Sequence, residues 1–261
     1  MTTSAARTQT GRWLMVGATD IGKVRKSNQD AFFIEPSGEV FLVADGMGGH
    51  AGGDVASRLT VENFTAQTTT GARPTLTHDT ADWWLRESIQ AANTRIRQVA
   101  HEQPELHNMG TTIVAVALIE TAAGTFAHIA HVGDSRAYLL HNGRLTQLTV
   151  DHSFVEELLR RGQITREQAA VHPDRHMLLR ALGIDDVPQV DCQTQPLTPG
   201  DCLLLCTDGL TKMLTDPDIE QQLLTDAPTL QASAQRLIDT ALDRGAHDNV
   251  TVVLCAENRA A

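Results

Sequence analysis

Aspartate residues stand at the ends of several apolar segments of this sequence. Three of these segments run into an aspartate beside a glycine, and a fourth segment follows an aspartate. Short apolar runs bounded in this way are typical of buried strands. If the last strand runs antiparallel to the other three, all four carboxylates lie at one edge of the sheets. The segments and their carboxylates are residues 40–44 with Asp45, 126–132 with Asp134, 202–206 with Asp208, and 250–254 with Asp248.

Carboxylates gathered in this way need a positive partner. Two of them about 4 Å apart repel by about 4 kcal/mol at an effective dielectric constant near 20, so such a group takes up protons or binds cations. Ligands that are all oxygen favour Mg²⁺, Mn²⁺ or Ca²⁺ over zinc. We therefore expect a site for one or more hard divalent metal ions. Asp30, which ends a polar loop, is a fifth candidate ligand.

The glycine-rich stretch after Asp45 has other interpretations. An ordinary strand-to-helix turn has a similar composition. A nucleotide cradle is not expected, because no Lys-Ser or Lys-Thr follows the glycines and their spacing is not G-x-G-x-x-G. Arg25, five residues before Asp30, is suited to bidentate contact with a phosphate. Residue chemistry alone favours a plain surface position for this arginine.

The wider pattern predicts a layered α+β domain. Helical spacing begins near Asp54 and recurs over residues 83–101, with Asp82 as a plausible N-cap, and over residues 230–244. Asn142-Gly143 between two apolar runs predicts a β-hairpin. No Pro- or Ser-rich linker divides the 261 residues. We expect one domain over residues 13–257, preceded by a loose, disordered polar tail over residues 1–12.

Composition excludes several classes of function. The net charge is −11 without a basic block, which argues against nucleic acid as a partner. No apolar run is long enough for a membrane helix, and the first residues lack the apolar centre of a secretory signal. The four cysteines include no Cys-x-x-Cys pair, so we expect buried free thiols in a reducing cytoplasm.

A family resemblance connects these motifs. The chain contains, in order, R-K-S-N-Q-D, V-A-D-G-M-G-G-H-A-G-G, G-T-T, V-G-D-S-R-A-Y, D-H-S, R-A-L-G, T-D-G-L and D-N-V-T-V-V. Their order and spacing resemble the bacterial branch of the metal-dependent type 2C (PPM) serine/threonine protein phosphatases, from about Trp13 to Ala256. The resemblance implies a four-layer α/β/β/α sandwich, in which two antiparallel β-sheets pack face to face with helices on both outer sides.

The resemblance also implies a set of roles around a binuclear Mn²⁺ or Mg²⁺ centre. Asp45 would bridge two metal ions, the Gly46 carbonyl would bind one, and Asp208 and Asp248 the other. Asp30 would hold metal-bound waters or a metal directly. Asp134 would help Asp208 to bind a third ion. Arg25 would bind the substrate phosphate, which reverses the interpretation from residue chemistry alone.

The implied reaction is hydrolysis of phosphoserine or phosphothreonine on proteins by a metal-activated water. Two positions depart from the family pattern: Gln29 replaces a frequent Glu, which is expected to alter metal affinity, and His50 follows Met47-Gly48-Gly49. His50 would either protonate the leaving alkoxide or only order a water. Residues 150–183 match the family's mobile flap beside the metal site, the expected place of substrate choice.

The expected partners are phosphorylated proteins, a Ser/Thr kinase and its targets among them. We expect the protein to be a cytoplasmic monomer. An alternative function is a catalytically weak module of the same fold that binds phosphopeptides. Loss of the carboxylates would indicate such a module, but all five are present.

Overall fold

The computed structural model describes residues 4–10, 13–48, 52–69 and 73–257. Its strands are β1 (Ser4–Thr10), β2 (Trp13–Asp20), β3 (Asp30–Ile34), β4 (Val40–Met47), β5 (Gly110–Thr111), β6 (Ile113–Thr121), β7 (Gly124–Val132), β8 (Arg136–His141), β9 (Arg144–Gln147), β10 (Asp191–Leu197), β11 (Cys202–Cys206) and β12 (Val250–Glu257). Its helices are α1 (Gly53–Thr69), α2 (Ala81–Glu102), α3 (Phe154–Arg160), α4 (Arg166–Ala170), α5 (Asp208–Thr211), α6 (Asp216–Leu224) and α7 (Leu230–Asp243), with a short 3-10 turn at Pro104–Leu106.

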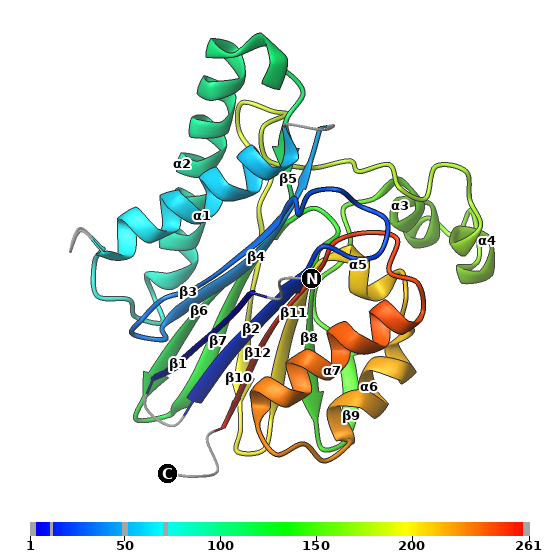
Figure 1. Cartoon of the computed structure of the whole chain (residues 1–261). Helices are drawn as coiled ribbons and strands as arrows, with labels where there is room; N and C mark the ends of the chain where they lie inside the picture. Colours follow the sequence, from blue (N-terminus) through cyan, green and yellow to red (C-terminus); the bar gives the residue numbers. More distant parts are fainter. Residues whose placement is uncertain (1–3, 11–12, 49–51, 70–72, 258–261) are drawn as a thin grey trace.

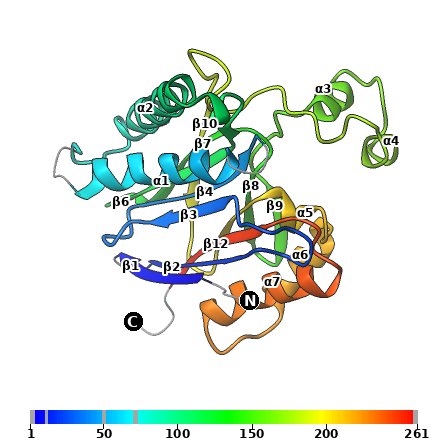
Figure 2. The same ribbon diagram turned by 45° about the horizontal axis from the view of Figure 1, so that its top comes forward.

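Two antiparallel sheets form the centre of the molecule. One has the strand order β1-β2-β12-β11-β8-β9 and the other the order β10-β7-β6-β4-β3, with β5 paired to β4. Helices α1 and α2 cover the second sheet, and α5, α6 and α7 cover the first, so that four layers result (Figures 1 and 2). The predicted α/β/β/α sandwich is confirmed. No helix among the described segments combines the length and the apolar character that crossing a bilayer requires.

The apolar runs seen in the sequence are strands buried on both faces. In β4, Leu42 packs under α1 and α2, whereas the next residue, Val43, faces the opposite sheet. In β12, Val252 packs under α7 and Val253 packs between the sheets. Alternate side chains of a strand point to opposite faces, and here both faces are covered. This double burial explains why these strands are apolar throughout and do not alternate with polar residues.

Antiparallel pairing brings the aspartates to one edge. Strand β11 ends where its antiparallel neighbour β12 begins, because Cys206 pairs with Val252. Strands β4 and β7 each pair antiparallel with β6 and therefore run in the same direction. At the start of β3, Asp30 pairs directly with Asp45. Strand β12 is thus antiparallel to β11, as the argument from the sequence required of these two strands.

Two local expectations were wrong. Residues 4–10 are not a loose tail, because they pair with β2 along its whole length, from Ser4 opposite Thr19 to Thr10 opposite Trp13. A polar strand can add to the unpaired edge of a sheet without an apolar signal of its own. Helix α2 begins at Ala81 after Thr80, and Asp82 lies inside its first turn.

The hairpin prediction at Asn142-Gly143 is confirmed by a positive φ at both residues.

The thiols lie in the core, as expected. Cys202, Cys206 and Cys255 are buried and Cys192 is partly buried, and all four are free. Burial raises the pKa of Cys202 and of Cys206 to about 12, so neither is a nucleophile at neutral pH.

Truncation of Leu205, which is fully buried between the two sheets, should lower the free energy of unfolding. We expect Leu205→Ala to cost about 2–5 kcal/mol, the range for large-to-small changes in a packed core. Leu224→Ala is the matched control, because that side chain is 50% exposed, and it should cost less than about 1 kcal/mol. Urea denaturation measures both values, and equal losses would contradict the packing described here.

Candidate metal and phosphate site

A cavity of about 710 Å³ opens at the edge where the aspartates meet. Four of the five predicted carboxylates line it, and so does Arg25. The fifth, Asp30, is buried. These residues come from five separate parts of the chain and from both sheets, so only the folded sandwich brings them together. The carboxylates that line the cavity are Asp45, Asp134, Asp208 and Asp248.

Asp30 is held by hydroxyl groups of the facing sheet. Its Oδ2 atom accepts hydrogen bonds from Thr207 Oγ1 at 2.8 Å and from Thr251 Oγ1 at 2.7 Å. Burial nevertheless raises the pKa of Asp30 to about 7, since it outweighs the two hydroxyl bonds and adds to repulsion from Asp208 and Asp248. Asp30 therefore has a fixed position and a carboxyl group that stays ionised only if positive charge is nearby.

Asp45 lies near the end of β4, where the backbone is held on both sides. Its carbonyl accepts from Thr111 Oγ1 at 2.8 Å and from the Thr112 amide at 2.9 Å. Gly46 follows, and a Cβ there would lie 2.0 Å from the Gly53 carbonyl, so only glycine lets α1 approach this closely. Burial raises the pKa of the Asp45 carboxyl well above its ordinary value, and each of the other four aspartates raises it further.

Asp134 lies in the turn after β7. Burial, followed by repulsion from Asp208 and Asp151, raises its pKa to about 8. The turn is fixed on both sides of this residue. The Gly133 amide donates to His152 Nδ1 at 3.1 Å, and the hydroxyl of Ser135 lies 2.7 Å from that of Thr112.

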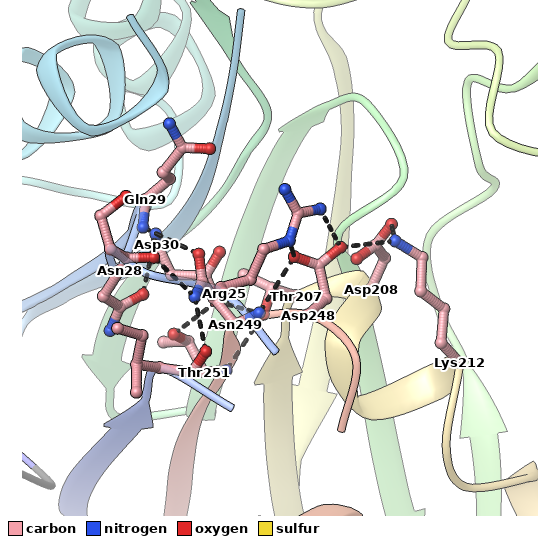
Figure 3. A network of polar contacts seen from close by, with 12 residues as sticks. Arg25, Asn28, Gln29, Asp30, Thr207, Asp208, Lys212, Asp248, Asn249 and Thr251 are labelled. Carbon is pink, nitrogen blue, oxygen red and sulfur yellow. Dashed lines mark hydrogen bonds and ion pairs between the residues drawn. The ribbon is translucent and has the colours of Figure 1, made fainter. Parts of the chain in front are cut away.

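Asp208 and Asp248 are bridged by a lysine that the sequence analysis did not single out. Lys212 Nζ lies 2.5 Å from Asp208 Oδ2 and 3.0 Å from Asp248 Oδ2 (Figure 3). Arg25 binds Asp248 from another side, with Nε 2.8 Å from Oδ1 and Nη2 2.9 Å from Oδ2. Burial raises the pKa of Asp248, but Lys212 and Arg25 together hold it below its ordinary value.

Asn249 fixes the polar loop that carries Arg25. Its Oδ1 accepts from the Gln29 amide at 2.8 Å, and its Nδ2 donates to the carbonyls of Ile21 and Ser27. In the same loop Gly22 has a φ of +78°, and a Cβ there would lie 2.2 Å from the Asp248 carbonyl. The side-chain amide group of Gln29 points away from Asp30 and Asp248 in Figure 3. The predicted effect of Gln29 on metal affinity stays a prediction.

The residues at this edge fit divalent metal ions. Asp208 Oδ1 is buried and lacks a hydrogen-bond partner among the described residues, and an orphaned carboxylate oxygen is costly unless a cation binds it. The other ligands available are also carboxylates, the donors that Mg²⁺ and Mn²⁺ prefer. Burial, with repulsion from neighbouring carboxylates, raises the pKa values of Asp30, Asp45 and Asp134, so a nearby cation would favour their ionised forms. These observations support a metal site, and the individual ligand roles stay predictions.

A second group of possible ligands lies nearby, formed by His131, His152 and Asp191. The two imidazole rings are stacked 4.5 Å apart with 20° between their planes, so their in-plane lone pairs cannot converge on one ion. His131 Nε2 contacts the Val150 carbonyl at 2.9 Å, and His152 Nε2 lies 3.2 Å from Asp191 and 3.1 Å from Arg180. We therefore interpret these histidines as polar residues with satisfied partners.

Residues 150–183 connect the site to two short helices. Helices α3 and α4 project beyond the sandwich (Figures 1 and 2), while Arg175, His176 and Leu178 line the cavity. Backbone hydrogen bonds join the two ends of this segment to the sheet edge. The His152 amide donates to the Gly133 carbonyl at 2.9 Å, and the Leu182 amide donates to the Thr111 carbonyl at 2.9 Å. His50, the predicted acid, lies outside the described residues.

Two arginines near the cavity form ion pairs. Arg136 binds Asp151 through both carboxylate oxygens, with Nε 2.8 Å from Oδ1 and Nη2 2.7 Å from Oδ2. Arg180 Nη1 lies 2.9 Å from Asp191 Oδ1. Both pairs lie beside the Asp134 turn and the ends of residues 150–183, where they support the cavity wall.

Comparison with known proteins gives one consistent result. The family model described as Protein phosphatase 2C matches residues 22–250. The serine/threonine phosphatase stp of Listeria monocytogenes is 41% identical over 239 residues, which are 90% of this chain and 92% of that protein. The structure of Stp1 from Staphylococcus aureus is 35% identical in sequence, with a TM-score of 0.85, and the match covers 93% of this chain and 94% of that chain. The structure of the catalytic domain of PstP in complex with two manganese ions is 35% identical in sequence, with a TM-score of 0.80, and the match covers 94% of this chain and 97% of that chain.

Fold and cavity thus define a metal-dependent hydrolase that acts on phosphorylated proteins. More narrowly, the chain belongs to the protein phosphatase 2C family and is a serine/threonine protein phosphatase. The family resemblance seen in the sequence motifs is confirmed.

The raised pKa of Asp134 predicts how the metal-free protein responds to pH. Folding raises the pKa of this carboxyl group to about 8, whereas its pKa in the unfolded chain is near 4. The folded protein therefore loses stability relative to the unfolded chain as the pH rises from about 4 to about 8. Asp134→Asn cannot ionise, so the metal-free variant should be more stable than wild type at pH 8, by about 1–3 kcal/mol. The difference should shrink as the pH falls to 5.

Denaturation with a chelator present, at pH 5 and at pH 8, measures this difference. Asp239→Asn is the control, because Asp239 is an exposed aspartate on α7. A difference between Asp134→Asn and wild type that is the same at both pH values would contradict the assigned ionisation.

Proposed function

We propose that this phosphatase hydrolyses phosphoserine and phosphothreonine at a centre of two Mn²⁺ or Mg²⁺ ions. The observation that carries the proposal is the cavity with four carboxylates and Arg25 on its wall. Bound there, the ions would acidify a water molecule and offset charge on the phosphoryl oxygens. PstP, a related phosphatase, is known with two manganese ions.

The chain's own residues divide the work of holding the ions. Asp45 would bridge both, as the family resemblance implies. The Gly46 carbonyl would bind one ion, and Asp208 with Asp248 the other. Asp30, fixed by Thr207 and Thr251, would hold metal-bound waters or a metal ion directly. Asp134 would join Asp208 at a third ion.

Arg25 would bind the phosphate. It lies at the rim of the cavity with its side chain 49% exposed, and its guanidinium group matches two phosphoryl oxygens. His50 would either protonate the leaving alkoxide of the serine or threonine or order a water there. Arg175 and His176, from the segment over residues 150–183, face the same space and would contact the protein substrate.

The proposed partners follow from the reaction. A phosphatase of this kind opposes a Ser/Thr kinase, so the kinase itself and its targets are the proposed substrates. We place this function in the cytoplasm and assign it to a monomer. The alternative is a catalytically weak module that binds phosphopeptides. Measuring the turnover of a phosphopeptide distinguishes the phosphatase from the binding module.

Hydrolysis of a phosphothreonine peptide should require both metal and Asp208. We expect activity with Mn²⁺, loss of activity with a chelator, and a decrease of about 100-fold or more in Asp208→Ala, the typical cost of losing one group preorganised around developing charge. Asp239→Ala should keep wild-type activity. Equal rates with Mn²⁺, with chelator and in Asp208→Ala would refute the mechanism. Tight peptide binding without turnover would favour the binding module.

Replacement of Arg25 should weaken productive phosphate binding. Loss of a charge-assisted hydrogen bond of about 1.5–3 kcal/mol corresponds to a decrease of about 10–100-fold in kcat/KM for Arg25→Ala. Arg25→Lys should recover only part of this loss, because lysine cannot form the bidentate contact. The neighbouring exposed Lys26 provides the matched control, and Lys26→Ala should have little effect. If Arg25→Ala and Lys26→Ala behaved alike, the phosphate role would be wrong.

A further inference from the structure

Lys212 occupies the space between two of the proposed metal ligands. It ends the short helix α5, one turn after Asp208, and its ammonium group contacts one oxygen of Asp208 and one of Asp248 (Figure 3). Only 30% of the side chain is exposed. The lysine therefore points into the cavity, with its charge directed at the carboxylates.

Few carboxylate oxygens of this pair are left for a metal ion. Lys212 engages Asp208 Oδ2 and Asp248 Oδ2, and Arg25 engages both oxygens of Asp248. The remaining oxygen, Asp208 Oδ1, is buried without a partner among the described residues. Over the described part of the chain, no three of the five aspartates bring their oxygens within 4.8 Å of one another. Within the Asp208–Asp248 pair, the ammonium group of Lys212 thus bridges the two carboxylates.

We propose that Lys212 is an internal competitor of the metal ion at the Asp208–Asp248 pair. The ammonium group neutralises the pair when metal is absent, and it has to leave before a divalent ion binds the same oxygens. Lysine suits this role because its charge is compact and its four-carbon stem is flexible. Lys212 therefore stabilises the metal-free protein and weakens metal binding. This inference rests on the proposed metal site.

Lys212→Gln separates this role from that of an ordinary ion pair. Calorimetric titration of the metal-free protein with Mn²⁺ should give a dissociation constant about tenfold lower than wild type, since one neighbouring charge typically shifts a charged equilibrium by one to three powers of ten. The melting temperature without metal should fall, and the increase on adding Mn²⁺ should exceed that of wild type. Lys26→Gln removes the same charge from the exposed loop and should leave the Mn²⁺ affinity near wild type.

A second variant covers the case in which Lys212→Gln does not fold without metal. Lys212→Arg keeps the charge and forms a more rigid, forked contact with carboxylates, so it should bind Mn²⁺ no more tightly than wild type. Unchanged or weaker Mn²⁺ binding in Lys212→Gln, or tighter binding in Lys212→Arg, would overturn the inference.

Asp208→Asn distinguishes failure of this inference from failure of the proposed metal site. If wild type bound no Mn²⁺, or if Asp208→Asn bound it as tightly as wild type, the metal site itself would be wrong and the inference would fall with it. If Asp208→Asn lost Mn²⁺ binding while Lys212→Gln matched wild type, the metal site would stand and only the role of Lys212 would fail.

Discussion

Mutual repulsion among carboxylates at one edge of the sandwich is the constraint on which the site depends. The pKa of Asp45 is raised by all four of its aspartate neighbours as well as by burial. Such a cluster persists in a folded protein only if rigid elements hold it and cations offset it. The two sheets provide the rigidity, because each central strand is packed on both faces and cannot move its end away from the others.

Two cations of the chain itself supply part of the compensating charge. Lys212 and Arg25 converge on Asp248, whose pKa is consequently lowered, whereas those of Asp30 and Asp134 remain raised. The negative charge is thus offset unevenly across the cavity. Burial and neighbouring carboxylates raise the pKa values of Asp30 and Asp45, so we expect an added cation to stabilise these two carboxylates most.

Much of the architecture follows from local sequence, and part of the site does not. The strands ending at Asp45, Asp134 and Asp208 could be predicted because their apolar runs reflect burial on both faces. The start of α2 could not, because it depends on Ala81, which packs fully buried against the core and draws the helix start ahead of Asp82. The edge strand β1 lacks a long apolar run and is placed by its pairing with β2 and by a hydrogen bond from Thr8 Oγ1 to the Pro36 carbonyl.

The supporting polar residues were also beyond prediction from their surroundings in the chain. Thr207 and Thr251 are far apart in sequence, yet both hydroxyls bind the same oxygen of Asp30. Lys212 has the spacing of an ordinary i, i+4 helix pair with Asp208, which usually means a surface contact of little energy. Only the fold shows that Asp248 completes the contact from a distant segment.

The pairing of Arg25 with Asp248 connects two functions that the motifs suggest separately. Arg25 donates two hydrogen bonds to a carboxylate that is a proposed metal ligand, and those two donors cannot serve a phosphate at the same time. A divalent ion bound to Asp248 would repel the guanidinium group of Arg25 and weaken its hydrogen bonds to the same carboxylate. If Asp248 is a ligand, metal binding would favour release of the arginine toward substrate. Arg25, the proposed phosphate-binding residue, would then be freer to contact substrate when the ions proposed for hydrolysis are bound.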